Sequence, residues 1–260
     1  MSTSALVNYH VRSEARQAFR FDVGGVIGNL ESPELVPTRV EVDDLRDGKR
    51  TVDFAADGIT FEQFPSAESR FDNSRDWEAA YDLELTKLLR GRINAREVIV
   101  FDHTVRVDDP GAPRKPARNV HNDYSTAGAR QRVIDLVGSE AARDYEAGHY
   151  AFINVWRPIE RPIGSSPLGF IRPESIEPDD WMTIDLIYPD RVGQILGVAA
   201  NASHSWFYLS RMRPDEVVIF NIYDNRGRPF LGHSALDMIE PKTTPTLRKS
   251  IESRTLVRFG

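Results

Sequence analysis

The chain has 260 residues, of which 40% are hydrophobic and 28% are charged, so it is long enough to form one sizeable domain with a buried core. Its formal net charge of −6 argues against a nucleic-acid partner. We expect no membrane partner, because no apolar run is long enough to span a bilayer and the first residues do not resemble a secretion signal. The sequence contains no cysteine, which excludes disulfides and thiolate metal sites and fits a cytoplasmic protein whose metal ligands are His, Asp or Glu.

The first third of the chain is predicted to consist of short strands followed by a helix. We expect a single domain over residues 1–260, in which residues 1–95 supply N-terminal strands and a support helix and residues 96–260 form the core. Short strands are predicted at residues 19–23 and 60–64, where apolar and polar side chains alternate.

A helix is predicted to follow these strands. Ser74 is the expected N-cap, and Trp77, Tyr81, Leu85 and Leu88 recur at helical spacing. This helix is expected to support the core that begins near residue 96.

From residue 97 onwards the pattern is typical of short strands separated by turn residues. Strands are predicted at residues 98–107, 150–156, 182–188, 194–199, 206–209, 217–220 and 250–259, and a second helix at residues 127–146. Many short strands with two helices indicate a mainly β fold, a barrel or sandwich with helical support.

His121 and Asp123 are the first residues that could carry chemistry. Residues i and i+2 of a strand face the same way, so the imidazole and the carboxylate are expected to point together into the barrel. They would supply two of the three ligands of a facial iron site, which leaves coordination positions open for oxygen. Taken alone the pattern is weak, because about one His-x-acid match is expected by chance among six histidines and 39 acidic residues.

Two downstream histidines compete for the place of the third ligand. His204 begins an aromatic strand and is also explained as a hydrogen-bonded histidine in a pocket wall. His233 precedes the last strand and its Arg-x-Ser motif, and we therefore favour His233 as the distal ligand.

Arg248 and Ser250 form the one Arg-x-Ser motif of the sequence, and strand alternation places both on one face. A guanidinium and a hydroxyl together suit a terminal carboxylate such as that of 2-oxoglutarate, whose keto-acid end can chelate a metal. Arg254 lies on the same strand face, so it could replace or assist Arg248. The sequence does not separate the two arginines.

These motifs, in this order, carry a resemblance to a known family. The matching segments are residues 101–106, 121–124, 154–159, 167–168, 204–209, 214–217, 233–235 and 248–254. The chain resembles the Fe(II)/2-oxoglutarate-dependent oxygenases of the secondary-metabolism hydroxylase and desaturase family, which includes cephalosporin-methoxylation and gibberellin-desaturase-like proteins. The resemblance covers about residues 75–259, and Gly232-His233-Ser234 departs mildly from the family's usual Pro-His-Thr.

The resemblance implies a double-stranded β-helix, a jelly-roll fold related to the cupins, with supporting helices. It also implies that Fe(II) is bound by His121, Asp123 and His233, and that Arg248 and Ser250 hold 2-oxoglutarate. Hydroxylation or desaturation of a small molecule, with O2 as co-substrate and succinate and CO2 as co-products, is the activity that this family suggests.

The residues predicted to surround the metal come from two strands. Asn154 and Trp156 are expected to share one face, as an amide near the cofactor and an aromatic wall, while Arg157 points away or lies at the strand end. Ordinary packing explains these three equally well. The predicted substrate-binding residues are Trp156, Arg157, His204, Trp206 and Tyr208.

Other polar residues are expected to have structural roles. His103 is predicted to be a hydrogen-bonded core histidine, and His10 and His149 are expected at the surface. The acidic runs at residues 41–44 and 177–180 are expected to be solvated loops.

Two other functional classes remain open on the sequence alone. One is a cupin-like metalloenzyme that does not use 2-oxoglutarate, and the other is a β-barrel binding protein without catalytic activity. The sequence leaves the oligomeric state open as well, with a homodimer as one option.

Overall fold

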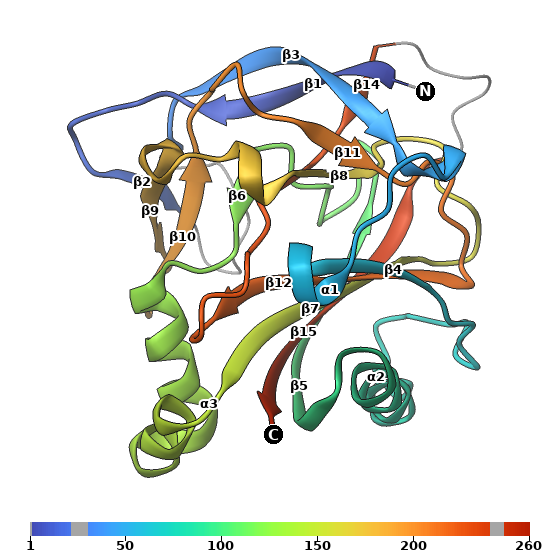
Figure 1. Ribbon diagram of the computed structural model, residues 1–260, viewed down its shortest axis with the longest axis vertical. Coiled ribbons are helices and arrows are strands. Elements are labelled where there is room, and N and C mark those ends of the chain that lie inside the picture. The colour runs from blue at the N-terminus through green and yellow to red at the C-terminus, as the bar shows by residue number, and fades with distance from the viewer. Residues whose placement is uncertain (1, 22–30, 240–246) are drawn as a thin grey trace.

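Two β-sheets face each other in the computed structural model, which describes residues 2–21, 31–239 and 247–260 (Figure 1). The ten-stranded sheet has the order β14-β1-β3-β11-β8-β13-β6-β10-β9-β2. Its strands are β1 (Ser2–His10), β2 (Gln17–Arg20), β3 (Leu35–Asp44), β6 (His121–Asn122), β8 (Leu168–Ile171), β9 (Trp181–Ile187), β10 (Val192–Val198), β11 (Trp206–Tyr208), β13 (His233–Ala235) and β14 (Asp237–Met238).

The second sheet has five strands in the order β4-β12-β7-β15-β5. They are β4 (Ile59–Gln63), β12 (Glu216–Asp224), β7 (Tyr150–Pro158), β15 (Lys249–Phe259) and β5 (Ala95–Val107). The helices are α1 (Phe54–Asp57), α2 (Glu78–Ile93) and α3 (Thr126–Ala147), with 3-10 turns η1 (Leu45–Asp47), η2 (Pro173–Ser175) and η3 (Pro178–Asp180). The predicted mainly β fold with supporting helices is confirmed. Among the helices of the described ranges, none is long and apolar enough to cross a membrane.

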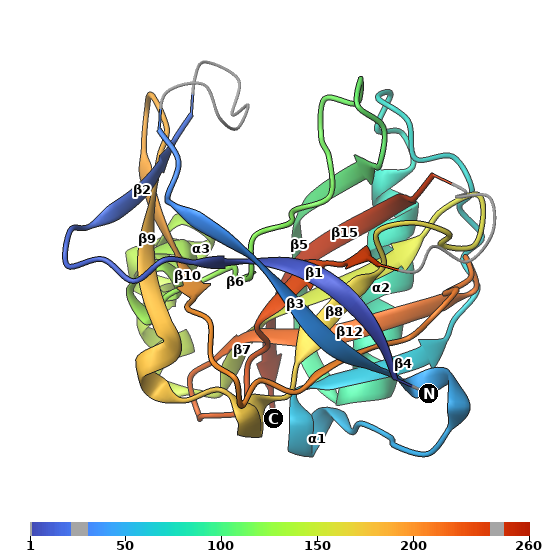
Figure 2. The same cartoon turned by 90° about the horizontal axis from the view of Figure 1, so that it is seen from above.

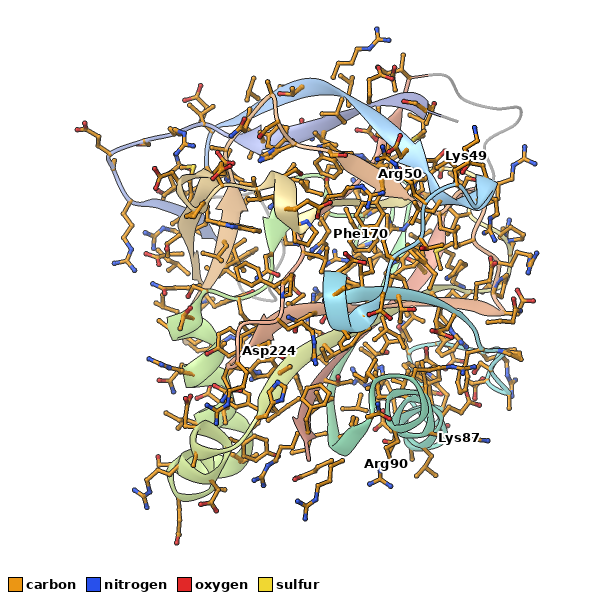
Figure 3. The ribbon with its side chains drawn as sticks, in the orientation of Figure 1. Lys49, Arg50, Lys87, Arg90, Phe170 and Asp224 are labelled. Carbon is orange, nitrogen blue, oxygen red and sulfur yellow. The ribbon has the colours of Figure 1, made fainter. Side chains whose placement is uncertain are left out.

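The main core lies between the two sheets and includes several large aromatic side chains. Phe152 and Trp156 of β7 meet Phe220 of β12 and Phe170 of β8, and all four are at most 1% exposed. Figure 3 shows Phe170 in the middle of the molecule, with Lys87 and Arg90 near its lower edge. Burying such side chains is the main favourable contribution to folding.

Strand β7 is buried on both of its faces, which explains its almost unbroken apolar sequence. Phe152 and Trp156 face the core, whereas Ile153 and Val155 face α2 on the other side of the sheet. A strand covered on both faces cannot show the polar alternation of a half-exposed strand.

The N-terminal strands extend both sheets. β1 and β3 join the ten-stranded sheet and β4 pairs with β12 of the other, which supports the proposed single domain. The predicted strand at residues 19–23 corresponds to β2, and its last two residues lie outside the described ranges. The expectation of a solvated loop at residues 41–44 was wrong, because these residues lie in β3, where residues 41–43 pair with β1 and Asp44 pairs with β11.

The other sequence-based boundaries differ in two informative places. Ser74 does not cap α2, because the helix begins at Glu78 and its N-cap, Trp77, makes no side-chain capping bond. The run at residues 177–180 is not simply solvated, since Asp180 is 2% exposed at the end of η3. In α3 the backbone kinks at Gly138, whose φ is +83°.

A substitution at Gly58 tests how closely α1 packs against the loop that leads to β13. Its φ is +72°, and a Cβ there would lie 2.1 Å from the carbonyl oxygen of Pro229, in the loop that leads to β13. Gly58→Ala should therefore cost about 2–5 kcal/mol, the sum of left-handed strain and a backbone collision. Gly48 is the matched control, because its φ is +69° and no described heavy atom lies within 4 Å of the added Cβ.

Urea unfolding of both variants measures the difference. Gly48→Ala should lose only about 1–2 kcal/mol, the strain alone. Equal losses in the two variants would contradict the close packing of α1 against the loop before β13.

Candidate metal centre

The pairing of β6 with β13 brings the predicted metal ligands together. His233 lies directly opposite His121 in this antiparallel pair, and Asp123 follows β6. Each residue offers one ligand atom, and these atoms all lie within 4.8 Å of one another. Figure 2 shows β6 between the strands of the five-stranded sheet and the group formed by β2, β9 and β10.

His121 and His233 both direct Nε2 to the place where the three ligand atoms converge. Nδ1 of His121 donates to the carbonyl oxygen of Asn119 at 2.8 Å, and Nδ1 of His233 donates to that of Leu231 at 3.0 Å. Each Nε2 therefore keeps its lone pair, and the Nε2 atoms lie 3.4 and 3.9 Å from Oδ1 of Asp123. Fixing the tautomer through the second nitrogen is how metal-binding histidines are usually oriented.

The protonation states also fit a cation. Burial lowers the pKa of His233 to about 3, so this imidazole is neutral at pH 7 and loses no proton on binding a metal. Burial alone would raise the pKa of Asp123, but the positive charge of Arg254 outweighs it and holds that pKa well below its usual range. Two imidazoles that direct Nε2 to one place, together with one carboxylate, suit iron(II), so the residues present fit the expected metal.

Charged and polar side chains extend from Asp123 along the core-facing side of the five-stranded sheet, and we call this group of residues the chamber. The residues lie in three cross-strand rows on β7, β15 and β5. The rows are Asn154–Arg254–Asp102, Trp156–Glu252–Thr104 and Pro158–Ser250–Arg106. Neighbouring rows are about 7 Å apart at the usual rise of a strand, so the rows extend far enough to contact both ends of a small dicarboxylate.

Arg248 lies at the end of the chamber that is farther from Asp123. Its Nε donates to Ser250 Oγ at 3.0 Å, its Nη1 donates to the carbonyl oxygen of Ser166 at 2.7 Å, and its guanidinium stacks over Trp156. Nη2 makes no hydrogen bond to any described residue. Burial and the neighbouring Arg106 lower the pKa of Arg248 to about 9, which still leaves it cationic at pH 7.

Arg106 is a chamber residue that was not predicted as part of the site. It pairs across the strands with Ser250, and its one hydrogen bond to a described residue goes to the carbonyl oxygen of Lys115. Burial lowers its pKa, although the nearby Glu252 opposes this effect. The signal in the sequence that could have indicated Arg106 is the strand pattern at residues 101–106. Placing Arg106 next to Ser250 from this pattern requires the β5–β15 register, which the sequence does not give.

The structure places the two remaining cofactor candidates next to the metal ligands. Asn154 and Arg254 both donate to Oδ2 of Asp123, at 2.9 and 3.0 Å. Trp156, a predicted substrate contact, forms the chamber wall beneath Arg248. Arg157 points to the opposite face of β7, where it donates to the carbonyl oxygen of Phe64.

The three other predicted substrate contacts lie in a separate cluster. His204 bonds to Tyr9 and to Asp180, Trp206 donates to the Tyr9 hydroxyl, and Tyr208 packs in the apolar cluster beneath β1. His204 is thus a hydrogen-bonded histidine and does not belong to the metal-ligand group that the described residues form. A substrate-binding role for these residues stays a prediction.

His10 was expected at the surface, and this expectation was wrong. The side chain is 1% exposed, and neither ring nitrogen has a partner among the described residues. Its ring fills the space above Gly197, where a Cβ would lie 2.6 Å from Cδ2 of His10. Gly197 pairs with His121, so His10 occupies the position beside the first metal ligand that a side chain at residue 197 would otherwise take. His103 meets its expectation, bonding to Asp82 and Ser253.

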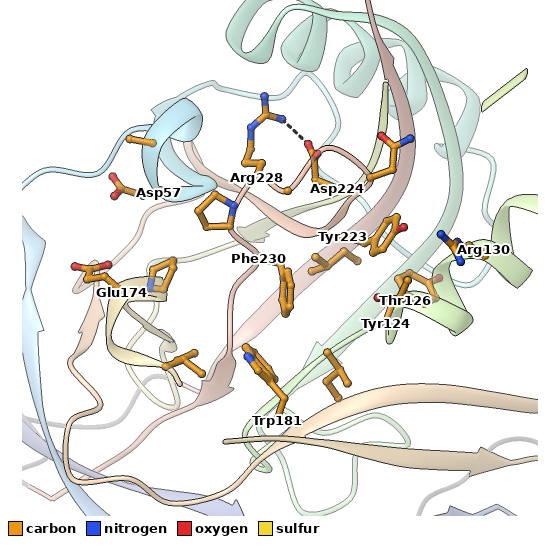
Figure 4. Close-up of a pocket in the computed structure, with 18 residues that line it drawn as sticks. Asp57, Tyr124, Thr126, Arg130, Glu174, Trp181, Tyr223, Asp224, Arg228 and Phe230 are labelled. Carbon is orange, nitrogen blue, oxygen red and sulfur yellow. Dashed lines mark hydrogen bonds and ion pairs between the residues drawn. The ribbon is translucent and has the colours of Figure 1, made fainter. Parts of the chain in front are cut away.

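A cleft of about 850 Å³ lies behind β6 (Figure 4). Its walls include Tyr124, Trp181, Leu196 and Phe230. Leu196 pairs with Asn122, and neighbours along a strand face opposite ways, so the cleft borders β6 on the side away from His121. None of the residues predicted for the site lines it.

The comparisons with known proteins agree with this geometry. A family model described as an oxidoreductase/YMDC permease-like domain matches residues 8–258. The Fe(II)/2-oxoglutarate-dependent dioxygenase nvfI of Aspergillus novofumigatus is 30% identical over 239 residues, which cover 86% of this chain and 84% of that protein. The chain belongs to the family of Fe(II)/2-oxoglutarate-dependent dioxygenases. The predicted family and enzyme class are therefore confirmed.

The dioxygenase is also similar to a second relative and to a solved structure. The hydroxylase/desaturase efuI of Hormonema carpetanum is 30% identical over 250 residues, covering 84% of the dioxygenase and 82% of that protein. A solved structure of the iron and alpha-ketoglutarate-dependent endoperoxidase NvfI superposes with a TM-score of 0.86 at 24% identity and covers 100% of this chain and 98% of that chain. This likeness confirms the jelly-roll fold.

Gly197 offers a test of the packing around His121 in the dioxygenase. Gly197→Ala should displace His10 or His121, lower stability by about 1–3 kcal/mol and weaken Fe(II) binding, because the added methyl collides with a ring and not with a flexible chain end. Gly193→Ala on the same strand is the control, since its Cβ would meet Leu186 at an ordinary 3.8 Å. Iron titration and thermal unfolding of both variants measure the effect, and indistinguishable behaviour would refute the packing of His10 against Gly197.

Proposed function

We propose that this dioxygenase binds Fe(II) through His121, Asp123 and His233 and uses it to hydroxylate or desaturate a small organic molecule. The observation that carries the proposal is that this ligand group adjoins rows of charged side chains that lead to the buried Arg248. A metal-binding group alone would fit any cupin-like enzyme. Bound iron and 2-oxoglutarate together supply the activation of O2, with succinate and CO2 as co-products.

We assign the distal carboxylate of 2-oxoglutarate to Arg248, Ser250 and Arg106. The guanidiniums of the buried Arg248 and the partly buried Arg106 are bonded to backbone carbonyls and a hydroxyl, and they repel each other unless an anion joins them. Perturbed charged groups of this kind cluster at functional sites. The distal carboxylate would receive donors from two strands, while the keto-acid end would extend along the chamber toward Asp123.

The residues of the chain have three tasks in this scheme. The arginines bind and orient the co-substrate, the triad fixes the metal, and the buried walls formed by Trp156 and Phe220 exclude water from the chamber. Relatives named as dioxygenases and as a hydroxylase/desaturase support a secondary-metabolite substrate for this chain as well. The cysteine-free composition supports a reducing cytoplasm as its location, and a homodimer stays a proposal.

His233 and His204 can be separated by metal binding. His233→Ala should lower the affinity for Fe(II) by about 100-fold or more, because a whole ligand is lost, whereas His204→Ala should leave it unchanged. Anaerobic iron titration with analysis of bound metal measures both variants, with thermal unfolding to confirm that each is folded. Loss of iron in His204→Ala, with His233→Ala unaffected, would show that the wrong distal ligand was chosen.

The arginine assignment predicts a graded loss of 2-oxoglutarate affinity. Arg248→Ala should weaken binding about 100-fold and Arg106→Leu about tenfold, in line with about 1.5–3 kcal/mol for hydrogen bonds to a charged group. Calorimetric titration of the iron-loaded enzyme under anaerobic conditions measures these changes. Arg161→Ala, at an arginine whose side chain is 54% exposed, is the control and should bind normally. Unchanged 2-oxoglutarate binding in Arg248→Ala would contradict the assignment of the distal carboxylate to Arg248, whereas no 2-oxoglutarate binding by the unmodified enzyme would favour the cupin-like alternative.

A further inference from the structure

We infer that Arg254 and Asn154 are positioning residues that make Asp123 a metal ligand through one oxygen only. The inference rests on the proposed function, because it requires a metal at His121, Asp123 and His233. It also assigns Arg254 a task different from gripping the co-substrate.

The two carboxylate oxygens of Asp123 have different surroundings. Oδ2 accepts from Asn154 Nδ2 at 2.9 Å and from Arg254 Nε at 3.0 Å. Oδ1 faces the two histidines, with Nε2 of His121 at 3.4 Å and Nε2 of His233 at 3.9 Å. Only Oδ1 therefore points to the place where the three ligand atoms converge.

Arg254 is itself fixed from two further sides. Its Nη1 donates to Asp102 at 2.7 Å and its Nη2 to Glu252 at 2.5 Å. All three nitrogens of the guanidinium are thus bonded to carboxylates within the chain. Nη1 also donates to Thr104 Oγ1 at 3.4 Å, so four of the five N–H groups are used and a bidentate grip on a further carboxylate, which needs two, is left to Arg248 and Arg106.

Asn154 is fixed by its place in the sheet. It is 0% exposed on the central strand β7 and lies directly opposite Arg254 in the β7–β15 pair. The two donors that reach Oδ2 therefore come from neighbouring, rigidly paired strands. Such outer partners orient a ligand before the metal arrives.

The consequence concerns the number of free coordination positions. A carboxylate that binds through both oxygens would occupy a position that the chemistry needs for 2-oxoglutarate or O2. With Oδ2 engaged by Asn154 and Arg254, Asp123 takes a single position and the facial arrangement stays open on its other side.

Cobalt(II) provides a readout that does not depend on turnover. We would titrate Co(II) into the full-length wild-type protein without 2-oxoglutarate, and record both the affinity and the visible ligand-field spectrum. Arg254→Lys keeps the charge but removes the Nε donor, and Asn154→Leu keeps the side-chain volume but removes the amide. Arg258→Lys, on the same strand and bonded to Glu97 away from the site, is the matched control.

Each of the two site variants should bind Co(II) about 10–100-fold more weakly, the usual range for outer partners of metal ligands, and should show a shifted spectrum because Oδ2 becomes free to bind. The control should match the wild type in both. If one site variant fails to fold, the spectrum of the other decides. If both folded variants keep the wild-type affinity and spectrum, the inference is overturned for both residues. If only Arg254→Lys keeps them, the inference is overturned for Arg254. Neither result would contradict the proposed function. A wild type that binds no Co(II) would instead refute the metal site itself.

Discussion

The pairing of His233 with His121 is the contact on which the functional geometry depends. These residues come from β6 and β13, strands of two and three residues that are too short to define a register by themselves. Their register is set by longer neighbours, because β13 also pairs with β8 and β6 with β10. The close approach of His10 to Gly197 then fills the space beside His121, so the metal ligands are held by packing that extends well beyond their own strands.

The same arrangement explains why strong charges are tolerated inside the protein. Arg106, Arg248 and Arg254 face the chamber together with Asp123 and Glu252. The three arginines differ in what they contact, since each nitrogen of Arg254 bonds to a carboxylate while the other two arginines are bonded mainly to backbone carbonyls. Arg106 and Arg248 form no ion pair with a carboxylate of the described residues, and such guanidiniums reduce stability unless an anion compensates them. An iron(II) ion next to Asp123 and a dicarboxylate between Arg106 and Arg248 would compensate these charges. The ligands that these residues would bind therefore give a physical reason for charges that reduce the stability of the protein alone.

The sequence revealed those parts of the site that depend on local alternation. His121 and Asp123, Asn154 and Trp156, and Arg248 and Ser250 are each two residues apart on a strand or directly beside its end, and strand geometry alone predicts that each pair shares a face. What the sequence could not give depends on contacts between distant strands. The role of Arg106 needs the β5–β15 register, the burial of His10 needs the fold of β1 across β10, and the bond of His204 to Asp180 needs the position of η3. Iron binding by the triad stays a prediction that the geometry supports.

The central claim is that a metal at the triad and a keto acid in the arginine chamber meet in one complex. The most direct test is the anaerobic addition of Fe(II) and 2-oxoglutarate to metal-free protein, followed by visible absorption. A keto acid that chelates iron produces a weak charge-transfer band, which neither component gives alone. Our account predicts this band, saturating at one iron and one 2-oxoglutarate per chain. Iron binding without the band would contradict the assignment of the chamber, and the absence of iron binding would contradict the metal centre.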